Sequence, residues 1–373
     1  MKNIAVFGGT FSPVHSEHVR LALAAKKEIG DCTLVVMPAG VPPHKKNADV
    51  LDGELRLEML RRAFGGNDGV IIDDYEIKKS GVSYTYQTIE EIKNRYNPDN
   101  VFFLVGTDML FDFPTWRYPE KILENATLFV TRRENEDEKK AEEFYLSRFS
   151  KPLKIGSYIG KNVSGTEIRS RLALGLDCSE FLDETVYSFI KEKGLYQEGE
   201  LGSFVRNSLT EKRLVHTANV MTLAVKYARF LKENADKAFL AAMLHDCAKY
   251  LNPSDYGFSY PDVPQPVVHQ FLGADVLEKF YGVKDKEILD SVRYHTTGRP
   301  DMTTLEKIVF LADLLEKDRT FPGVEILRSA VEKDFEKGFY LSVNELYKFL
   351  SADGKEVYYL TKECRDYYNA ANK

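Results

Sequence analysis

Apolar and polar positions divide the chain into two parts of different character. In the first part, short apolar runs alternate with segments of helical spacing, which is typical of repeated β-α units. The expected strands are residues 4–7, 33–37, 70–77, 101–105 and 127–131, and the expected helices are 19–29, 54–64, 88–96 and 175–194. This order predicts an α/β fold, a Rossmann-like and mostly parallel sheet with helices on both faces.

After a short polar stretch at 197–200, strand-like alternation nearly disappears. The helical segments expected there are residues 212–233, 235–248, 267–281, 284–295, 305–316 and 324–349. The sequence therefore predicts two domains, an α/β domain over 1–197 and an all-α domain over 204–373. A length of 373 residues agrees with two domains.

Composition narrows the classes of function. A net charge of −6 argues against a nucleic-acid partner, although nucleotides need only a local positive site. No apolar run approaches membrane-spanning length and no signal peptide is recognisable, so we expect a cytoplasmic protein without a membrane partner. The four cysteines are scattered and read as reduced thiols: Cys32, Cys178, Cys247 and Cys364. The charge run at 134–143 reads as a solvated loop and helix face.

The stretch 8–18 joins the first expected strand to the first expected helix. Its glycine turn lets backbone N–H groups approach an anion, and a helix N-terminus favours negative charge. His15 and His18 are three residues apart, so they share a face in a first helical turn. Either one alone is equally well explained as a surface or capping residue. No histidine lies between His44 and His216, which suggests two separate sites.

The stretch Gly8-Gly9-Thr10-Phe11-Ser12-Pro13-Val14-His15-Ser16-Glu17-His18 resembles the GGTFDPxHxGH signature of the HxGH nucleotidyltransferases. Four further stretches, at 38–45, 83–88, 106–109 and 163–169, together with Trp116, resemble bacterial nicotinate-nucleotide adenylyltransferases. The resemblance covers residues 1–197. It implies that the phosphate of nicotinate mononucleotide attacks the α-phosphorus of ATP and releases pyrophosphate. Such a reaction relies on positioning and charge stabilisation.

The resemblance also implies roles for individual residues. His15 and His18 would donate to phosphate oxygens, and Lys45 and Arg169 would add positive charge. The implied ATP-binding residues are Gly8, Gly9, Thr10, Phe11, Ser164 and Thr166, and those of the acceptor pocket are Tyr84, Thr85, Asp108 and Trp116. Mg²⁺ would be held largely by phosphates and water. Trp116 also fits an ordinary buried aromatic, and Thr85 a helix N-cap.

Three residues depart from the family pattern. Ser12 stands where the family usually has Asp, Glu17 replaces the Gly of HxGH, and Gly165 replaces the second Ser of ISSTxIR. Glu17 matters most, because an inward carboxylate would weaken ATP binding, whereas an outward one would have little effect.

A second set of polar residues interrupts the apolar helices of the second part. His245 and Asp246 are expected inside one such helix, Asp313 inside another, and His216 near a helix start. Burying them is costly unless they are paired or metal-bound. One such histidine is more often a core residue whose hydrogen bonds are satisfied within the protein. With His269 and His295 the set reaches four histidines and two aspartates, which favours a metal cluster.

The order H…HD…H…H…D resembles the HD-domain phosphohydrolase superfamily, and residues 293–300 with 310–313 look similar to its symmetrical dinucleoside-tetraphosphatase subgroup. The resemblance covers about residues 204–330 and implies cleavage of diadenosine tetraphosphate into two ADP. The implied metal ligands are His216, His245, Asp246, His269, His295 and Asp313. Two transition metals suit this ligand set, and the resemblance favours iron. Lys249 and, more weakly, Arg299 are candidate phosphate contacts; Lys249 equally fits a solvated helix end.

Three interpretations of the whole chain follow. The first is a bifunctional enzyme of adenine-nucleotide metabolism. In the second, one half, the first more readily than the second, is a non-catalytic nucleotide-binding regulatory module. The third keeps both activities with other acceptor nucleotides or guanosine polyphosphates. The sequence leaves open the base preference, channelling between sites and assembly into a homo-oligomer.

Overall fold

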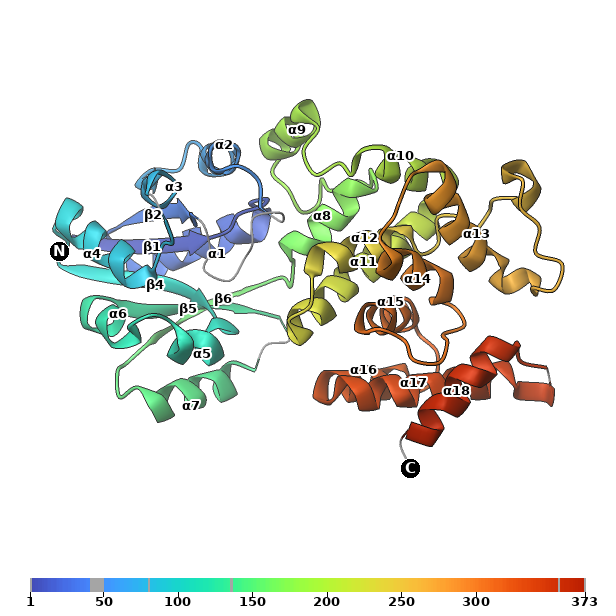
Figure 1. Cartoon of the computed structure of the whole chain (residues 1–373). Coiled ribbons are helices and arrows are strands. Elements are labelled where there is room, and N and C mark those ends of the chain that lie inside the picture. Colours follow the sequence, from blue (N-terminus) through green and yellow to red (C-terminus); the bar gives the residue numbers. More distant parts are fainter. Residues whose placement is uncertain (1, 41–49, 80, 135–136, 355, 372–373) are drawn as a thin grey trace. The chain divides into compact units, whose positions relative to one another are not determined.

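The computed structural model describes residues 2–371 except 41–49, 80, 135–136 and 355. The chain divides into two compact units, residues 1–168 with 178–195 and residues 169–177 with 196–373 (Figure 1). Within the described residues, no helix combines the length and the apolar character that crossing a membrane requires.

The first unit is built on one six-stranded sheet with the strand order β3-β2-β1-β4-β5-β6. Its strands are β1 (Asn3–Gly9), β2 (Cys32–Pro38), β3 (Val70–Ile72), β4 (Asn100–Gly106), β5 (Thr127–Arg133) and β6 (Lys154–Gly160). Every neighbouring pair is parallel. The order reverses between β1 and β4, and ligands of doubly wound sheets bind beyond the carboxyl ends of the strands at such a switch point. Gly8 and Gly9, expected in a turn, are the last two residues of β1, and the turn that follows them lies there.

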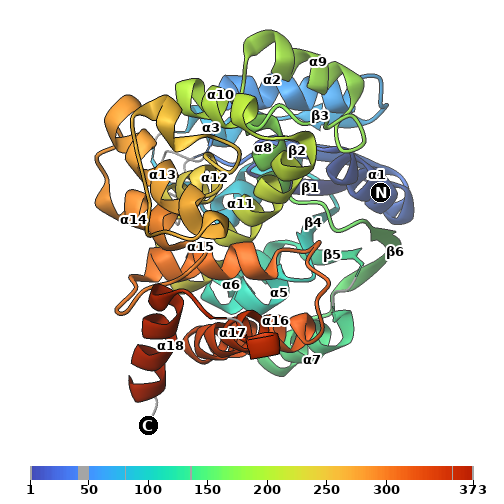
Figure 2. The ribbon, with the colours of Figure 1, turned by 90° about the vertical axis from the view of Figure 1, so that its right-hand side faces the viewer.

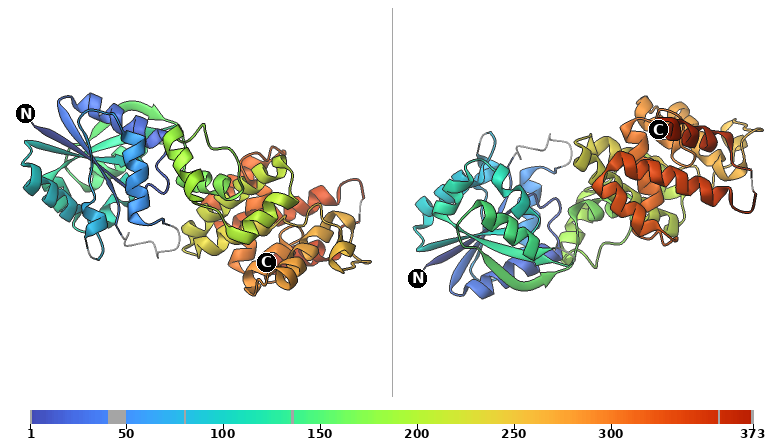
Figure 3. Two further views of the ribbon diagram at one scale, coloured as in Figure 1. Left: turned by 90° about the horizontal axis from the view of Figure 1, so that it is seen from above. Right: turned by 90° about the horizontal axis from the view of Figure 1, so that it is seen from below.

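Both faces of this sheet are covered by helices (Figure 3). The helices of the first unit, with α8 reaching into the second, are α1 (Ser16–Ile29), α2 (Gly53–Phe64), α3 (Tyr75–Lys78), α4 (Thr85–Tyr96), α5 (Met109–Asp112), the 3₁₀ turn η1 (Phe113–Thr115), α6 (Pro119–Asn125), α7 (Glu138–Arg148), α8 (Gly165–Ala173) and α9 (Glu184–Lys193). Along β1, Ile4 and Val6 join Ile89 of α4 and Ile122 of α6 in one core. Ala5 between them is also fully buried, on the opposite face. This double burial explains the continuous apolar runs.

Two expectations for the first unit need correction. The strand expected over 70–77 ends at Ile72 and is followed by the short helix α3. The helix expected over 175–194 begins only at Glu184, after the Asp183 N-cap, although it does end at Gly194 in the left-handed conformation (φ 61°). Strand β6 was not expected, because its pattern is weakly apolar at the sheet edge.

The second unit is entirely helical (Figure 2). Its elements are α10 (Gly199–Ser208), α11 (Glu211–Leu231), α12 (Ala235–Leu244), η2 (Pro253–Tyr256), α13 (Gln265–Phe280), α14 (Lys286–Tyr294), α15 (Thr304–Leu315), α16 (Val324–Lys333), α17 (Phe335–Leu350), η3 (Ala352–Gly354) and α18 (Tyr359–Ala371). Helices α11 to α15 share one apolar core that includes Val220, Leu244, Leu272, Val292 and Leu311. Some of the candidate metal ligands lie next to these core residues in the chain, as His245 follows Leu244.

The single helix expected over 324–349 is in fact two. Asp334 is extended (φ −155°, ψ 105°), ends α16, and caps α17 by accepting a hydrogen bond from the Lys337 N–H. A Cβ at Gly338 would lie 2.5 Å from the backbone of Val331, so the two helices pack too closely for a larger residue. Their continuous helical spacing hid the break.

Candidate active sites

In the first unit, His15 and His18 form the N-terminal cap of α1. The backbone N–H of His15 donates to His18 Nδ1 at 3.2 Å, and that of His18 donates to His15 Nδ1 at 3.3 Å. The two rings stack with centroids 3.5 Å apart. Because both Nδ1 atoms accept hydrogen bonds, both rings carry their proton on Nε2. The capping interpretation is confirmed, and it is compatible with phosphate binding, since the cap selects the tautomer that donates from the far edge of each ring.

Burial keeps both imidazoles neutral. It lowers the pKa of His15 to about 3, with a further contribution from the Arg133 guanidinium. Burial, His15 and Arg133 together hold the pKa of His18 well below its ordinary value. Arg133 is the last residue of β5, so it reaches the same carboxyl edge of the sheet. The sequence analysis did not single out Arg133, and the one signal available was its position at the end of a strand.

Glu17, the most serious departure from the family pattern, is turned into the protein. Its carboxylate pairs with Arg20 at 2.6 Å and accepts from the Lys161 N–H at 3.0 Å and the Tyr158 hydroxyl at 3.3 Å. These contacts lie on the β6 side of α1, whereas the two histidines cap its N-terminus. The buried carboxylate of Glu17 therefore points away from the two histidines, which is the alternative in which its charge has little effect on ATP binding.

Arg56 of α2 is a buried cation that the sequence analysis did not single out. Its guanidinium donates to the carbonyls of Ala39 at 2.7 Å, Leu51 at 2.9 Å and Thr10 at 3.0 Å. It thus ties the turn after β1 to the chain after β2. Ser12, in the same turn, is also buried, and its Oγ accepts from the Leu51 N–H at 3.5 Å.

The loop with His44 and Lys45 lies outside the described residues. At the start of α8, Ser164 acts as a cap, because its Oγ accepts from the Glu167 N–H at 3.1 Å. Thr166 is buried on the same helix. Arg169 lies one turn further on and belongs to the second compact unit. Its assignment to the ATP site stays a prediction.

The residues expected around the acceptor nucleotide lie in two segments at the carboxyl edge of the sheet, one that follows β4 and one at the start of α4. Asp108 follows β4 and is exposed. The half-buried Trp116 packs its indole against Phe113 and Phe103, with centroids 5.3 and 6.1 Å away. Tyr84 occupies the N-cap position of α4 and Thr85 is the first helical residue, so Thr85 is not the N-cap.

In the second unit, the six predicted ligands come together at the ends and inner faces of five helices. His216 lies on α11, His245 and Asp246 follow α12, His269 lies on α13, His295 follows α14, and Asp313 lies on α15. His245 and Asp246 therefore stand just beyond a helix rather than inside it. Ligand atoms within 4.8 Å of one another form three overlapping groups: His216 with His245 and Asp246, His245 with His295 and Asp313, and Asp246 with His269 and His295.

The orientation of two histidines is set by their own helix ends. His245 Nδ1 lies 2.6 Å from the Ala242 carbonyl, and His295 Nδ1 lies 2.8 Å from the Val292 carbonyl. A carbonyl only accepts, so both rings are protonated on Nδ1 and present the Nε2 lone pair to the cluster. This backbone support is typical of metal-ligating histidines. Burial lowers the pKa of His245, and it lowers that of His269 to about 4, which keeps both rings neutral.

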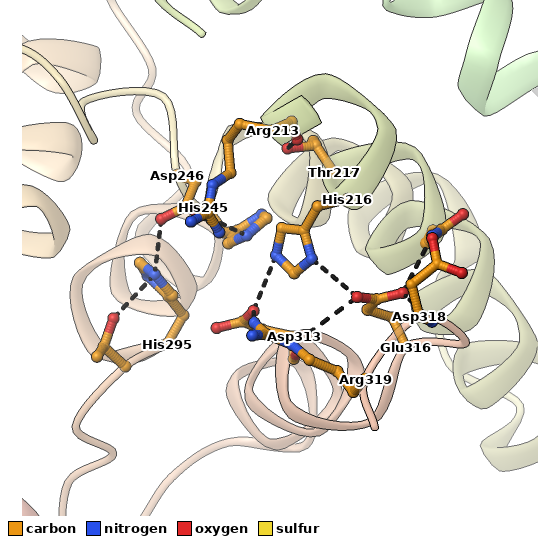
Figure 4. Close-up of polar contacts among 12 residues, drawn as sticks. Arg213, His216, Thr217, His245, Asp246, His295, Asp313, Glu316, Asp318 and Arg319 are labelled. Carbon is orange, nitrogen blue, oxygen red and sulfur yellow. Dashed lines mark hydrogen bonds and ion pairs between the residues drawn. The ribbon is translucent and has the colours of Figure 1, made fainter. Parts of the chain in front are cut away.

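His216 lies between two carboxylates (Figure 4). Its Nε2 is 3.0 Å from Asp313 Oδ1, and its Nδ1 is 3.1 Å from Glu316 Oε1. Burial opposes protonation, but the two carboxylates outweigh it and raise the pKa of His216. The pKa of Glu316 is lowered despite burial, chiefly by its hydrogen bond to His216. Glu316 was missed, although it lies one helical turn after Asp313.

Two more residues missed in the sequence are arginines beside the ligand aspartates. Arg213 Nη1 lies 3.0 Å from Asp246 Oδ2, and Arg319 Nη2 lies 2.6 Å from Asp313 Oδ1. Arg213 stands one helical turn before His216, so helical spacing from that histidine was the available signal.

The two basic residues expected to contact phosphate differ in position. Lys249 Nζ is 3.0 Å from His269 Nε2 and 3.6 Å from Asp246 Oδ1, so it borders the cluster. The guanidinium of Arg299 makes two bonds to the fully buried carboxylate of Glu306, at 2.7 and 2.9 Å. Arg299 is therefore engaged in an ion pair with Glu306, in the first turn of α15, and its expected contact with phosphate stays a prediction.

The cluster fits a divalent metal ion by two independent criteria. His216 Nε2, His245 Nε2 and Asp246 Oδ1 are buried and make no well-formed hydrogen bond, although His216 Nε2 lies 3.0 Å from Asp313 Oδ1 and Asp246 Oδ1 lies 3.2 Å from His269 Nε2. Such an arrangement is expensive without a ligand. Neutral imidazoles with carboxylates also form a donor set that binds transition metals well.

Comparison with known proteins gives a family match for each half of the chain. Residues 6–171 match the cytidylyltransferase-like family and residues 213–318 match the HD domain, so the chain is a nucleotidyltransferase joined to an HD-type hydrolase domain. The chain belongs to the nicotinate-nucleotide adenylyltransferase family. A probable nicotinate-nucleotide adenylyltransferase from Clostridium botulinum (strain Eklund 17B / Type B) is 36% identical over 201 residues, which are 53% of this chain and 100% of the relative.

Two further proteins are similar to the chain. A Mycoplasma genitalium protein named probable nicotinate-nucleotide adenylyltransferase/Ap4A hydrolase is 26% identical over 370 residues, 96% of this chain and 97% of its own. The other is known from a crystal structure, that of a predicted HD superfamily hydrolase involved in NAD metabolism from Clostridium acetobutylicum. Its sequence is 33% identical, and the match covers 46% of this chain and 96% of the other chain with a TM-score of 0.43.

Proposed function

We propose that the chain is a bifunctional enzyme. Its first unit transfers the adenylyl group of ATP to nicotinate mononucleotide, and its second unit hydrolyses dinucleoside tetraphosphate to two ADP. The observation that supports the proposal best is the presence of two polar centres, the His15–His18 cap and the six-residue His/Asp cluster, in a chain that is similar over nearly its whole length to a relative named for both activities.

In the first unit, the phosphate oxygen of nicotinate mononucleotide attacks the α-phosphorus, a new P–O bond forms, and the bond to the bridging oxygen breaks to release pyrophosphate. The Nε2–H groups of His15 and His18 donate to oxygens of the α- and β-phosphates, where negative charge develops. Because both rings are neutral, they supply hydrogen bonds rather than full charges. Positive charge is assigned to Arg133, Lys45 and Arg169, and Mg²⁺ accompanies ATP.

In the second unit, the six cluster residues would hold two metal ions, for which iron is the proposed identity. Bound metals lower the pKa of a water molecule so that hydroxide is available at neutral pH. The Nδ1 bonds of His245 and His295 to backbone carbonyls keep their Nε2 lone pairs directed into the site. Lys249 stands beside His269 and Asp246, in a position to neutralise a phosphate oxygen.

The alternative of a non-catalytic first unit receives no support from Glu17, whose carboxylate is occupied by Arg20, Tyr158 and the Lys161 N–H. Two variants of the full chain test the proposal. His18→Ala should abolish pyrophosphate release from ATP and nicotinate mononucleotide while leaving hydrolysis of diadenosine tetraphosphate intact. Asp246→Ala should do the opposite. Failure of the unsubstituted protein in either assay, with metal supplied, would reject that half of the proposal.

A further inference from the structure

The side chain of Gln270 joins two segments that carry candidate metal ligands. Gln270 directly follows His269 on α13, and its amide binds the residues that directly follow His295 at the end of α14. The side chain is fully buried. Burying an amide is costly unless its hydrogen bonds are made, so its partners show which part of the chain it holds in place.

The amide oxygen of Gln270 receives two backbone N–H groups. Gln270 Oε1 accepts from the N–H of Thr296 and from that of Thr297, both at 3.2 Å. The amide NH₂ group only donates, so these two bonds fix which end of the amide is the oxygen. Gln270 Nε2 then donates to Thr297 Oγ1 at 3.0 Å, and this hydroxyl donates to the Gly298 carbonyl at 2.9 Å. The turn 296–298 is therefore tied to α13 through its backbone and through one hydroxyl.

This turn also determines what faces the ligand nitrogens. Thr296 Oγ1 lies 2.9 Å from His295 Nε2 and 3.3 Å from His269 Nε2. The two histidine nitrogens are 3.3 Å apart. His295 Nε2 and His269 Nε2 lie 3.5 and 3.2 Å from Asp246 Oδ1, and the three residues form one of the ligand groups. A shift of the turn relative to α13 would therefore change the spacing of the two histidines.

Another ligand group stands apart from this turn. The group of His216, His245 and Asp246 is built from α11 and from the segment that follows α12. Its histidines are oriented by Glu316 and by the Ala242 carbonyl. Metal ligands must lie within about 0.2 Å of the distances that the ion prefers. A loosened turn after α14 would therefore affect the two groups unequally.

We propose that Gln270 is a positioning residue for one of the two metal ions, because it sets the spacing of His269 and His295 by tying the turn after α14 to α13. It acts through the backbone of Thr296 and Thr297. The inference rests on the proposed two-metal site of the second unit, but it concerns the binding of a metal ion, which can be measured without hydrolysis.

The test is titration of the chelator-stripped full chain with Co²⁺, followed by calorimetry and by the visible absorption of the bound ion. The unsubstituted chain should bind about two ions. Gln270→Met keeps the length of the side chain and removes both polar groups. It should weaken the binding of one ion about 10- to 100-fold and leave that of the other within about threefold.

Thr297→Val is a milder variant, because it keeps both backbone N–H bonds to Gln270 and removes the hydroxyl that Nε2 binds. It should weaken the binding of the same ion by less than Gln270→Met does. If Gln270→Met does not fold, Thr297→Val decides alone: selective weakening supports the inference, and unchanged affinity for both ions overturns it.

Phe339→Leu is the control for lost stability, since Phe339 is fully buried on α17 and lies outside the ligand groups. It should lower the melting temperature without selective loss of one ion. Equal weakening of both ions in Gln270→Met, or the same loss of one ion in Phe339→Leu, would overturn the inference. Selective loss of one ion from a chain that does not cleave diadenosine tetraphosphate would support the inference and reject the hydrolase proposal.

Discussion

His216 Nδ1 lies 3.1 Å from Glu316 Oε1, and this contact decides which nitrogen of the ring faces the cluster. Glu316 is 3% exposed and is itself held by Asn219 and the Asp318 N–H. His245 and His295 obtain the same orientation from backbone carbonyls, whereas His216 lies within a helix whose carbonyls are already bonded. A carboxylate therefore replaces the carbonyl at this position.

Substituting Glu316→Gln should weaken metal binding about 10- to 100-fold, because the ring loses the carboxylate that orients it and raises its basicity. Chelator competition measures this affinity directly. Glu363→Gln, at an exposed position on α18, is the control and should bind metal normally. Unchanged affinity in Glu316→Gln would show that His216 does not depend on this contact.

His245→Ala should remove most of the bound transition metal, since His245 Nε2 belongs to two of the three ligand groups. Elemental analysis of protein purified without chelator should show about two metals per chain before the substitution. Adenylyl transfer should be unaffected, which also tests folding of the first unit. A variant with its full metal content contradicts the assignment.

Acid should destabilise the first unit through His15. Its folded pKa is about 3 and its ordinary value is 6.5, so between these pH values the unfolded chain binds a proton that the folded chain does not. The contribution to stability is therefore complete above pH 6.5 and is lost as the pH falls, by about 1.4 kcal/mol per pH unit in this window. Denaturant unfolding at pH 7 and pH 5 should show the loss.

His15→Asn provides the comparison for this pH effect, because Asn caps helices well and does not titrate. Its unfolding free energy should fall less between pH 7 and pH 5 than that of the unsubstituted chain. Parallel curves for the two proteins would mean that His15 is not buried in a neutral form.

Replacing Glu17 with the Gly usual in the family should change the KM for ATP less than about threefold, because the carboxylate is already paired away from the histidines. Stability should fall by roughly 1 kcal/mol or more, since Gly is a poor helix residue and the bonds to Tyr158 and Lys161 are lost. A KM for ATP that drops tenfold or more in Glu17→Gly would show that the charge reaches the ATP site.

Arg56→Met should destabilise the first unit by roughly 3 kcal/mol, because three partly buried carbonyls lose their donor. It should also lower kcat/KM for adenylyl transfer, since the turn after β1 loses its link to Ala39. Arg61→Met, on the half-exposed face of the same helix, is the control. Equal melting temperatures for the two variants would contradict a structural role for Arg56.

Strand and helix periodicity determined the parallel sheet, the helical second domain and the cluster residues, because burial on both faces of a sheet leaves continuous apolar runs and buried polar residues stand out among them. The break at Asp334 escaped detection, because helical spacing continues from α16 into α17 and the bend depends on close packing at Gly338.

The sequence by itself determined that His15 and His18 share one turn and that His216, His245, Asp246, His269, His295 and Asp313 are candidate ligands, since local spacing and the cost of burial are written in the residues. Tertiary structure decided the rest. It placed Glu17 against β6, Arg133 near the histidines, and Glu316, Arg213 and Arg319 around the cluster. These contacts join segments up to 144 residues apart, and the direction of a side chain across such a distance depends on packing that no local pattern contains.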